Sequence, residues 1–565
     1  MTVSTKNISY DLSGLLLIWI LAILLINPIG NFPLNDDWSF AIAVKNFLTM
    51  EGFYPTDWTS MTLISQVIWG SLFGEIFGFS HTILRISTLV LSFIGLVTIY
   101  FVARKLTLNR WSAYFMTLLI AFNPLFFSLS FTFLTDIPFA VFSIISIFFY
   151  IETLQNPSPK IVYFVLGTFF AIVSTLDRQI GLFIPLAFAI ANAVRYGWQV
   201  QRLLHSFLSI GLTLIVLFGF NYWLDISGKT PALYGHQMHN LIDILSKPKW
   251  IMKVIPYYGF IIIMYVGLFL SPLLVIWYSS NSKKQDTLKK IILVSFVVLS
   301  IITIALYISR DATMPYLGNI FSKIGVGPLT LYDTYILQSD LNTGALFSFK
   351  IISGITITSL SILGGSILIG FVSSKLLLWK LNIALLQTDP SQIVPFFLLI
   401  GVLIYIGPLL LMGGYDRYLI VPIILVALLI ISDIETMPIL KSRIFAIGIF
   451  SIFLLFSIVA THDYLSWNKT RWIAIENLLN KKIMASEIDG GFEFNGLYLY
   501  DPDYQRKPLK SWWWVHDDKY IITFSEVEGY TAVNKYKFTR WMPILKNNIY
   551  VLKRNLDSKD IKFEK

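Results

Sequence analysis

The sequence predicts an α-helical membrane protein with about thirteen spanning helices and a small α/β domain at its C-terminal end. The 565 residues are 56% hydrophobic and only 13% charged, whereas soluble proteins carry about 25% charged residues. Long apolar runs recur as far as residue 460, and beyond it hydropathy falls and charge rises. Most of the chain is therefore expected to lie in lipid.

The apolar segments are the first elements to place, since a spanning helix needs roughly 20 residues and somewhat fewer inside a bundle. They lie near residues 13–30, 80–102, 112–130, 137–152, 161–175, 179–194, 206–224, 254–278, 291–308, 346–372, 394–412, 417–432 and 444–460. The first run ends without a small-residue cleavage pattern, so we expect it to be retained as a span.

Two regions outside the spans are expected to fold. Residues 31–79 follow the first span and predict short amphipathic helices in the membrane interface. Residues 461–565 are enough for a small domain beside a membrane domain formed by residues 1–460. Within this tail the sequence predicts one helix, Trp467–Met484, and two strands, Lys519–Ser525 and Asn548–Lys553.

Lys and Arg in the short loops predict the orientation, because they concentrate on the cytoplasmic side. With a cytoplasmic N-terminus, the inner loops carry Arg104, Lys105, Arg110, Lys160, Arg195, Arg202, Lys283, Lys284, Lys289, Lys290, Lys375, Lys380, Lys441 and Arg443. Most loop acids then lie outside, although the 225–253 loop is a basic exception. We therefore expect a multi-pass protein of the plasma (inner) membrane with an extracytoplasmic C-terminal domain.

The composition also limits the partners. The net charge of +10 is accounted for by loop lysines and arginines facing cytoplasm and anionic lipid, so no nucleic acid is expected. The chain has no cysteine, which excludes disulfides, a thiolate nucleophile and cysteine-ligated metals.

Two adjacent acids, Asp36 and Asp37, follow the first span. Ionisable groups at a membrane boundary are costly unless they serve a site. Such a carboxylate can act as a general base toward a hydroxyl or help to hold a divalent cation. The alternative is that the pair caps the helix beginning near Trp38.

A second acid, Asp136, follows Thr135 at the start of the fourth span. Taken alone, this pattern favours helix capping, with Pro138 in the first turn. Its position on the same outer face as Asp36 favours a second acidic member of one site.

Arg178 and Gln179 lie in a polar turn between two apolar runs. Arg178 can hold a phosphate and Gln179 can orient it, because the guanidinium fork suits phosphate oxygens. The alternative is a local salt bridge between Asp177 and Arg178, which contributes little at a surface.

Tyr415 and Arg417 follow two glycines at the outer end of two late spans. Arg417 can also meet a lipid phosphate, and Tyr415 can anchor the interface. The alternative is that Arg417 extends to the lipid headgroups.

Three consecutive tryptophans, Trp512 to Trp514, stand out in the tail. Tryptophan can stack on the face of a sugar. Packing of the three rings against the membrane is an equal alternative.

These motifs resemble those of the GT-C superfamily of integral-membrane glycosyltransferases. More narrowly, they are similar to the family 39-like group that includes protein O-mannosyltransferases and lipid A aminoarabinose transferases. Asp36-Asp37, Thr135-Asp136, Arg178-Gln179 and Tyr415 to Arg417 stand where that group has its acidic and phosphate-binding motifs. Residues 462–467 and 488–496 look like the outward tail of bacterial members. Where many members have Asp-Glu, this chain has Asp-Asp, so either acid could be catalytic.

The resemblance implies a GT-C fold that transfers a sugar from a polyprenyl-phosphate donor to a glycan, lipid or protein acceptor on the outer face. Asp36, Asp37 and Asp136 would be the catalytic acids, with Asp36 as general base and inversion at the sugar. Arg178, Gln179, Tyr415 and Arg417 would bind the donor phosphate. A divalent metal (Mg, Mn or Zn) held by Asp36 and Asp136 is left open.

Two other functions fit a chain of this composition. A flippase for lipid-linked sugars should show internal repeats and charges near the bilayer midplane, whereas these charges cluster at one face and no repeat is visible. A surface-glycan polymerase or ligase would place its catalytic centre in a large outer loop instead of the early acidic pair.

Overall fold

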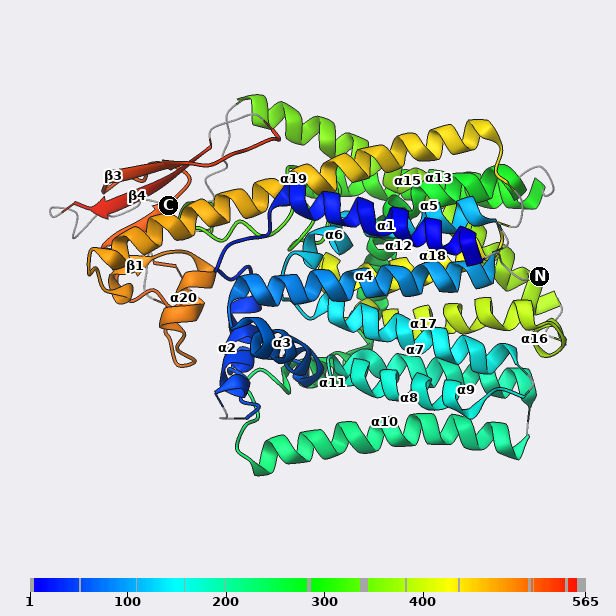
Figure 1. Ribbon diagram of the computed structural model, residues 1–565. Helices are drawn as coiled ribbons and strands as arrows, with labels where there is room; N and C mark the ends of the chain where they lie inside the picture. Colours follow the sequence, from blue (N-terminus) through cyan, green and yellow to red (C-terminus); the bar gives the residue numbers. More distant parts are fainter. Residues whose placement is uncertain are drawn as a thin grey trace.

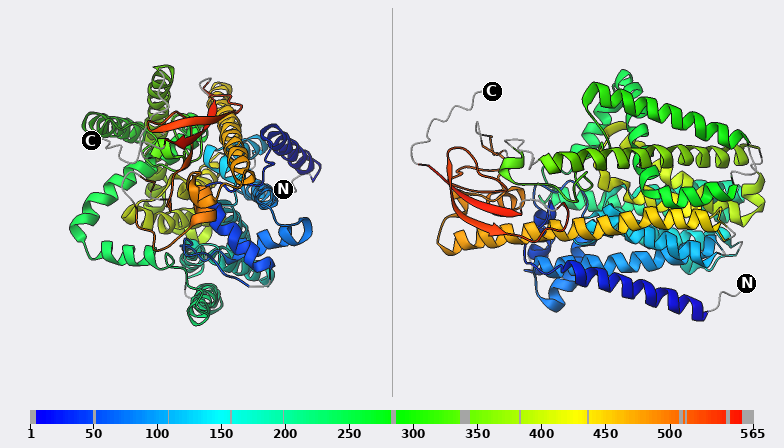
Figure 2. Two further views of the ribbon diagram at one scale, coloured as in Figure 1. Left: turned by 90° about the vertical axis from the view of Figure 1, so that its left-hand side faces the viewer. Right: turned by 90° about the horizontal axis from the view of Figure 1, so that it is seen from above.

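The computed structural model shows a bundle of long helices with a small sheet beyond one end (Figure 1). It describes residues 5–555 except 50–51, 108, 157, 198, 282–285, 336–343, 382–383, 435–436, 507–509, 512 and 544–546. The helices run along one axis, and the view from above shows the sheet beyond the same end (Figure 2). We call this end the site end. The first residues of α1 lie at the opposite end (Figure 1).

Ten of the described helices are long and apolar enough to cross a membrane, or eleven if one bent pair forms a single span. The ten are α1 (Thr5–Ile26), α4 (His81–Leu106), α7 (Asp136–Gln155), α9 (Phe183–Tyr196, continuing a 3-10 helix Gln179–Leu182), α10 (Val200–Ile226), α12 (Pro248–Asn281), α13 (Asp286–Arg310), α15 (Gly344–Leu381), α17 (Pro390–Met412) and α19 (Leu440–Asn480). The polytopic helical fold predicted from the sequence is therefore confirmed.

The bent pair is α5 (Arg110–Ala121) and α6 (Pro124–Ser130), whose axes differ by 60°. Asn123 causes the break because it precedes a proline, which disfavours helical geometry at that position. Its side chain then accepts the backbone N–H groups of Leu125 and Phe126 and so caps α6.

The remaining two predicted spans are helices shorter than the roughly 20 residues of a full-length span. They are α8 (Ile161–Thr175) and α18 (Ile420–Ile431), with 15 and 12 residues. All residues of α18 are buried. A helix surrounded by other helices need not match the full bilayer thickness, which explains why a count of apolar runs exceeds the number of full-length spans.

Close packing between α12 and α15 depends on glycine. A Cβ added to Gly267 of α12 would lie 2.2 Å from the backbone nitrogen of Gly365 in α15. Small residues allow two helix backbones to approach closely in a membrane, where lipid supplies no hydrophobic driving force. The two backbones are therefore in direct contact at this level of the bundle.

Short elements gather at the site end. The two helices predicted between residues 31 and 79 are α2 (Asp37–Leu48) and α3 (Ile64–Phe77). The other short elements at this end are α11 (His236–Leu245), α14 (Tyr332–Tyr335), α20 (Phe492–Leu499) and the 3-10 helices Asp416–Leu419 and Ala485–Glu487. Of these, α2 contacts both α3 and α20, and Figure 1 shows α2 at the site end of the bundle. The short helix α16 (Ala384–Thr388) lies at the opposite end of the bundle (Figure 1).

The C-terminal sheet has four strands in the order β1-β2-β4-β3. They are β1 (Ile488–Asp489), β2 (Tyr520–Thr523), β3 (Tyr530–Lys537) and β4 (Asn548–Arg554). β1 pairs with β2 in parallel, and the other two pairs are antiparallel. The predicted strands correspond to β2 and β4, whereas β1 and β3 were not predicted.

α19 joins the bundle to this sheet as one uninterrupted helix of 41 residues. Residue 460, where the sequence suggested a domain boundary, lies in its middle, and the helix predicted over Trp467–Met484 is its second half. Figure 1 shows α19 continuing beyond the bundle toward the sheet. The membrane part and the C-terminal part are thus linked by helix and not by a loop.

Candidate active site

Four segments that are distant in the sequence meet at the site end. They are the start of α2, the turn before α7, the turn after α8 and the turn after α17. Ion pairs connect one charged residue from each segment in the order Asp36, Arg417, Asp136 and Arg178. We call these four residues the ion-pair chain. It brings together four of the seven residues that the sequence singled out.

Asp36 is the partly exposed end of the ion-pair chain. Its Oδ2 lies 3.1 Å from Nη2 of Arg417, and its Oδ1 accepts a hydrogen bond of 3.0 Å from Nε1 of Trp58. Its side chain is 18% exposed, whereas that of Asp136 is 1% exposed. Asp36 makes no capping hydrogen bond to α2, so the capping alternative is wrong for this residue.

Asp136 is buried between the two arginines. Its Oδ1 lies 2.9 Å from Nη2 of Arg178, and its Oδ2 lies 3.9 Å from Nε of Arg417. Nε of Arg178 also donates a hydrogen bond of 2.8 Å to Thr135 Oγ1. Neither Thr135 nor Asp136 caps α7 with its side chain, since the structure shows no side-chain cap at this helix start. The Thr-Asp motif therefore serves the charged cluster and not the helix end.

Arg178 forms its ion pair with Asp136 and not with its neighbour Asp177, so the local salt-bridge alternative is wrong. Its guanidinium lies 5.1 Å from the ring centroid of Tyr418 and 5.9 Å from that of Phe139. A cation above an aromatic face is attracted by the ring quadrupole. These contacts fix the guanidinium between α7 and the 3-10 helix Asp416–Leu419.

Arg417 is the centre of the ion-pair chain. It is 6% exposed, so the alternative in which its side chain extends to lipid headgroups is wrong. Its guanidinium lies 5.2 Å from the Tyr415 ring and 5.7 Å from the Tyr418 ring. Among the described residues its Nη1 has no hydrogen-bond partner. A buried arginine with a donor left over can bind a further acceptor without losing both carboxylates.

Asp37 has a different environment from Asp36. Its Oδ1 accepts the backbone N–H of Leu34 at 2.5 Å and its Oδ2 accepts that of Phe133 at 3.1 Å. Burial raises the pKa of its carboxyl group to about 7. Because the side chain satisfies two buried backbone donors, Asp37 holds the segment before α2 against the segment before α7. This contact fixes the separation between Asp36 and Asp136.

Asp416 makes an equivalent connection on the other side of the site. Its carboxylate accepts the backbone N–H groups of Ile320, Phe321 and Arg417 at 2.6 to 3.2 Å. Burial raises its pKa to about 7. The residue thereby attaches the loop between α13 and α15 to the turn that carries Arg417.

The other two predicted phosphate-binding residues lie at the edge of this arrangement. Tyr415 is 48% exposed and covers the guanidinium of Arg417 with its ring. Gln179 is half-buried and lies beside the hydroxyl of Tyr234, which follows α10. The structure thus places Tyr415 next to the ion-pair chain and turns Gln179 toward the segment that follows α10.

The C-terminal part closes over the acidic pair. The backbone N–H of Asn35 donates to Oε1 of Glu493 in α20 at 3.0 Å. Oε2 of Glu493 lies 2.8 Å from Nη1 of Arg471 in α19, and both side chains are fully buried. Thr330 Oγ1 donates to the same Oε2 at 2.6 Å. Glu493 therefore joins α2, α19 and the loop that follows α13.

An aromatic cluster also covers the segment that carries Asp36 and Asp37. Its buried members are Trp38, Phe492, Trp513 and Trp514, with Trp58 and Tyr500 packed against them. The rings of Trp58 and Trp514 are 5.2 Å apart and nearly perpendicular. A Cβ added to Gly496 would lie 2.4 Å from the Trp38 ring, so this glycine allows α20 to reach it. The described tryptophans of the 512–514 motif thus pack on the acidic loop and not on lipid; Trp512 lies outside the described residues.

Replacing Arg471 tests how much its ion pair with Glu493 stabilises the folded protein. In Arg471→Met the fully buried carboxylate of Glu493 loses its charged partner, which costs about 3–5 kcal/mol. We expect a large fall in the thermal unfolding midpoint of the purified protein in detergent. Lys519→Met is the matched control because it breaks an exposed ion pair with Glu487 in the same part of the chain. Equal shifts in both variants would contradict the importance of this closure.

The metal hypothesis can be tested against the side chains present. Among the described residues there is no group of three or more His, Cys, Asp or Glu side chains that could hold a metal ion. Asp36 and Asp136 are each within 4 Å of the Arg417 guanidinium, which occupies the place of a bridging cation. In this arrangement the two acids do not fit a divalent metal.

Several residues of the site were not predicted to belong to it. Trp58 was expected only as part of an interfacial helix, and Asn35, Arg471 and Glu493 were not assigned a role. The run that includes Gly490, Gly491 and Gly496 was the available signal, because glycines flanking an acid indicate a backbone in close contact.

Comparison with known proteins gives one family match. Residues 67–223 match the model of the family described as dolichyl-phosphate-mannose-protein mannosyltransferase. This match confirms the resemblance to the O-mannosyltransferase group that the motifs indicated. The matched residues include Asp136, Arg178 and Gln179, whereas Asp36 and Arg417 lie outside them. No curated protein sequence shows a significant match to the chain.

Two solved structures are similar in outline. One is ArnT from Cupriavidus metallidurans bound to undecaprenyl phosphate, with 13% identity, coverage of 97% of this chain and 98% of that chain, and a TM-score of 0.43. The other is the archaeal oligosaccharyltransferase AglB from Archaeoglobus fulgidus with an inhibitory peptide and a dolichol-phosphate. It has 14% identity, coverage of 89% of this chain and 62% of that chain, and a TM-score of 0.42. These scores are too low to support an argument about the site.

Proposed function

We propose that this chain is a membrane glycosyltransferase that moves a sugar from a polyprenyl-phosphate carrier to a hydroxyl group of a glycan, lipid or protein acceptor. The observation that carries the proposal is the ion-pair chain, in which one accessible carboxylate is joined to two buried arginines. A general base next to fixed cations suits the displacement of a phosphate leaving group by an alcohol. The family match over residues 67–223 supports this reaction class.

Asp36 would act as the base in the transfer. The acceptor oxygen forms a bond to the anomeric carbon of the donor, and its proton passes to the Asp36 carboxylate. Asp36 suits this role because it is the most exposed of the site acids and Trp58 holds Oδ1 in place. Asp37 is less suited, since backbone N–H groups occupy both of its oxygens.

The arginines would stabilise the departing phosphate. As the bond between the anomeric carbon and the phosphate oxygen breaks, negative charge grows on the polyprenyl phosphate. Arg417 has an Nη1 donor left over for that charge, and Arg178 lies on the far side of Asp136. Fixed cations in a buried site act strongly because they need not reorganise during the reaction. A single displacement of this kind inverts the anomeric configuration.

The stoichiometry of the products tests the reaction class. Each transferred sugar should release one molecule of free polyprenyl phosphate, which thin-layer chromatography of a phosphorus-labelled donor would measure. A flippase would move the donor across the bilayer with no release. Transfer of label without matching polyprenyl phosphate would contradict a single displacement on this donor.

The proposed membrane orientation places the site end outside the cytoplasm. Arg110 at the end opposite the sheet pairs with Asp11 of α1 at 2.8 Å, which is consistent with a basic cytoplasmic face. Lys283 and Lys284, which belong to the same charge pattern, lie outside the described residues. A plasma (inner) membrane location follows from the proposed polyprenyl donor, and the C-terminal part would then face the acceptor.

Chelation should leave the reaction intact. Because Arg417 lies between Asp36 and Asp136, we expect the rate of transfer to change by less than about twofold when EDTA is added to the purified enzyme. Mg²⁺ or Mn²⁺ added afterwards should not raise it. Loss of transfer in EDTA and recovery with one metal would establish the metal hypothesis and require the arginine to move when donor binds.

A further inference from the structure

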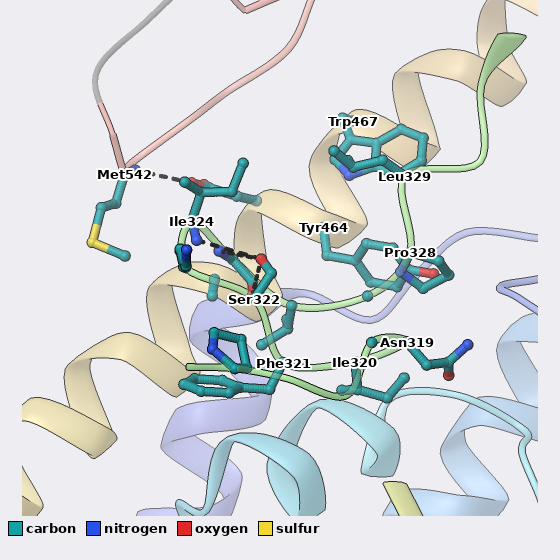
Figure 3. Close-up of a pocket in the computed structure, with 18 of the residues that line it drawn as sticks. Asn319, Ile320, Phe321, Ser322, Ile324, Pro328, Leu329, Tyr464, Trp467 and Met542 are labelled. Atoms are coloured by element: carbon teal, nitrogen blue, oxygen red, sulfur yellow. Dashed lines mark hydrogen bonds between the residues drawn. The ribbon is translucent and has the colours of Figure 1, made fainter. Parts of the chain in front are cut away.

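A cavity of about 550 Å³ lies beside the ion-pair chain, on the far face of the loop between α13 and α15. Residues 315–329 form one wall, the middle of α19 forms another, and residues 538–542 close it. Figure 3 shows Trp467 and Leu329 at one end of the lining and Met542 at the other. The volume is within the range of small-ligand sites, which is roughly 300–1,000 Å³.

Two of the cations that line this cavity form no ion pair with a carboxylate within the described part of the chain. Lys323 is half-buried and forms no hydrogen bond or ion pair within the described part of the chain. Arg540, also half-buried, donates only through Nε to the carbonyl oxygen of Met542, at 3.5 Å. Burial lowers the pKa of both groups. Asp311 and Asp463 attract Lys323 and Arg540 without forming an ion pair with them. A partly buried charge without a direct partner is stabilised when a ligand supplies one.

Asp463, the single carboxylate among the lining residues, attracts Arg540 but forms no ion pair with it. Asp463 accepts the backbone N–H groups of Trp541 and Met542 at 2.8 and 2.9 Å, and its Oδ1 lies 2.9 Å from His462 Nδ1. Its oxygens are therefore occupied in holding the segment that carries Arg540. Lys350 adds a third positive group to the lining. The cavity is electropositive as a result.

The rest of the lining is apolar and lies at the level where spans end. Aromatic and aliphatic side chains provide most of the wall, among them Phe321, Val326, Trp467, Phe524 and Phe538. Lys350 is near the start of the apolar span of α15, which begins at Ser348. Lipid phosphates lie at this depth of a bilayer, above the hydrocarbon core.

We propose that this cavity binds a phosphate group attached to an apolar chain, with Lys323 and Arg540 holding the phosphate. Ammonium and guanidinium groups are the usual partners of phosphate oxygens. The apolar wall receives the adjoining chain. The phosphate could belong to a membrane lipid headgroup or to a soluble compound, and the chemistry of recognition is the same for both.

The proposed site is separate from the transfer site and does not depend on the proposed function. The shared loop nevertheless connects them, since Asn319 Oδ1 accepts a hydrogen bond of 3.2 Å from Asn35 Nδ2 on the opposite face. Ligand binding is measured without any sugar donor. A protein that binds the phosphate but transfers nothing would therefore refute the transfer reaction alone.

Native mass spectrometry of the purified full chain tests the proposal. The probe is phosphatidylglycerol added in detergent, with diacylglycerol as the phosphate-free analogue. We expect one phosphatidylglycerol per chain and at least a tenfold weaker affinity in Lys323→Gln/Arg540→Gln. Lys247→Gln is the control, because Lys247 is an exposed residue following α11 whose ammonium pairs with Asp243. Unchanged binding in the double variant, or equal binding of diacylglycerol, would overturn the proposal.

A second variant removes no charge. Gly325 lines the cavity, and a Cβ added there would meet no atom within 4 Å. Gly325→Leu should fill the cavity, leave the unfolding midpoint close to that of the wild type and weaken phosphatidylglycerol binding; full binding in this folded variant would overturn the assignment to this cavity.

Competition then distinguishes the two sources of phosphate. If glycerol 1-phosphate displaces phosphatidylglycerol, a soluble phosphate compound is sufficient. If it fails at millimolar concentration, the natural ligand carries its own apolar chain. Both results support the phosphate site.

Discussion

Asp36→Asn should reduce the rate of sugar transfer by about 10³-fold, which is within the range for loss of a general base. The amide can still accept the hydrogen bond from Trp58 and lie beside Arg417, so the local geometry should survive. It cannot accept the proton of the acceptor hydroxyl. Turnover per folded enzyme, measured with labelled donor and membrane extract, is the quantity to compare.

Asp37→Asn tests whether Asp37 has a structural or a catalytic role. Its carboxylate satisfies the N–H groups of Leu34 and Phe133, and an amide offers one acceptor oxygen for these two donors. We therefore expect a lower unfolding midpoint in Asp37→Asn and a nearly normal rate per folded molecule. The reverse result, with a folded and inactive Asp37→Asn and an active Asp36→Asn, would assign the base to Asp37.

Arg417→Lys should lower the rate of transfer by about 10²-fold or more, as for removal of one donor to a developing oxyanion. An ammonium group preserves the charge between Asp36 and Asp136 but cannot bind both acids and a phosphate with separate nitrogens. The unfolding midpoint should change less in Arg417→Lys than in Arg417→Gln, which leaves two acids without their cation. Rates of both variants should be compared with that of Lys519→Met, which lies away from the site.

Full activity in Arg417→Lys would show that only the charge at this position matters. Complete loss of the folded protein in Arg417→Lys would make the residue structural. A folded variant with a slow chemical step and unchanged donor affinity is the result that supports stabilisation of the leaving phosphate.

Much of the membrane part could be predicted, because an apolar run is recognised from consecutive residues alone. Each predicted apolar run is largely helical, since roughly 20 apolar residues in lipid have few alternatives to helical structure. The run 112–130 differs in forming two helices with a break at Asn123. The bounds of α8 agree with the predicted run 161–175, whereas the start of α18 differs from its predicted run because residues 416–419 form a 3-10 helix. β3 was missed since its residues are mostly exposed or half-buried and Lys535 and Lys537 interrupt the pattern of a buried strand.

The charged residues of the site could be predicted from the sequence, but the groups that they contact could not. Asp36, Asp136, Arg178 and Arg417 were recognisable because charge is rare in this chain. The roles of Asp36 and Asp37 could not be separated, since they differ only in the backbone groups that each one meets. The contact of Glu493 with the site could not be predicted, because its partner Asn35 is 458 positions away in the sequence. Contacts of this kind depend on the packing of the whole chain.

The most direct test of the account is a transfer assay with purified protein in detergent, a panel of radiolabelled polyprenyl-phosphate sugars and native membrane extract as acceptor. We predict that label from one donor reaches an acceptor with the wild-type protein and that Asp36→Asn abolishes this transfer. No transfer from any donor, together with movement of the donor across the bilayer in proteoliposomes, would contradict a glycosyltransferase and establish a flippase.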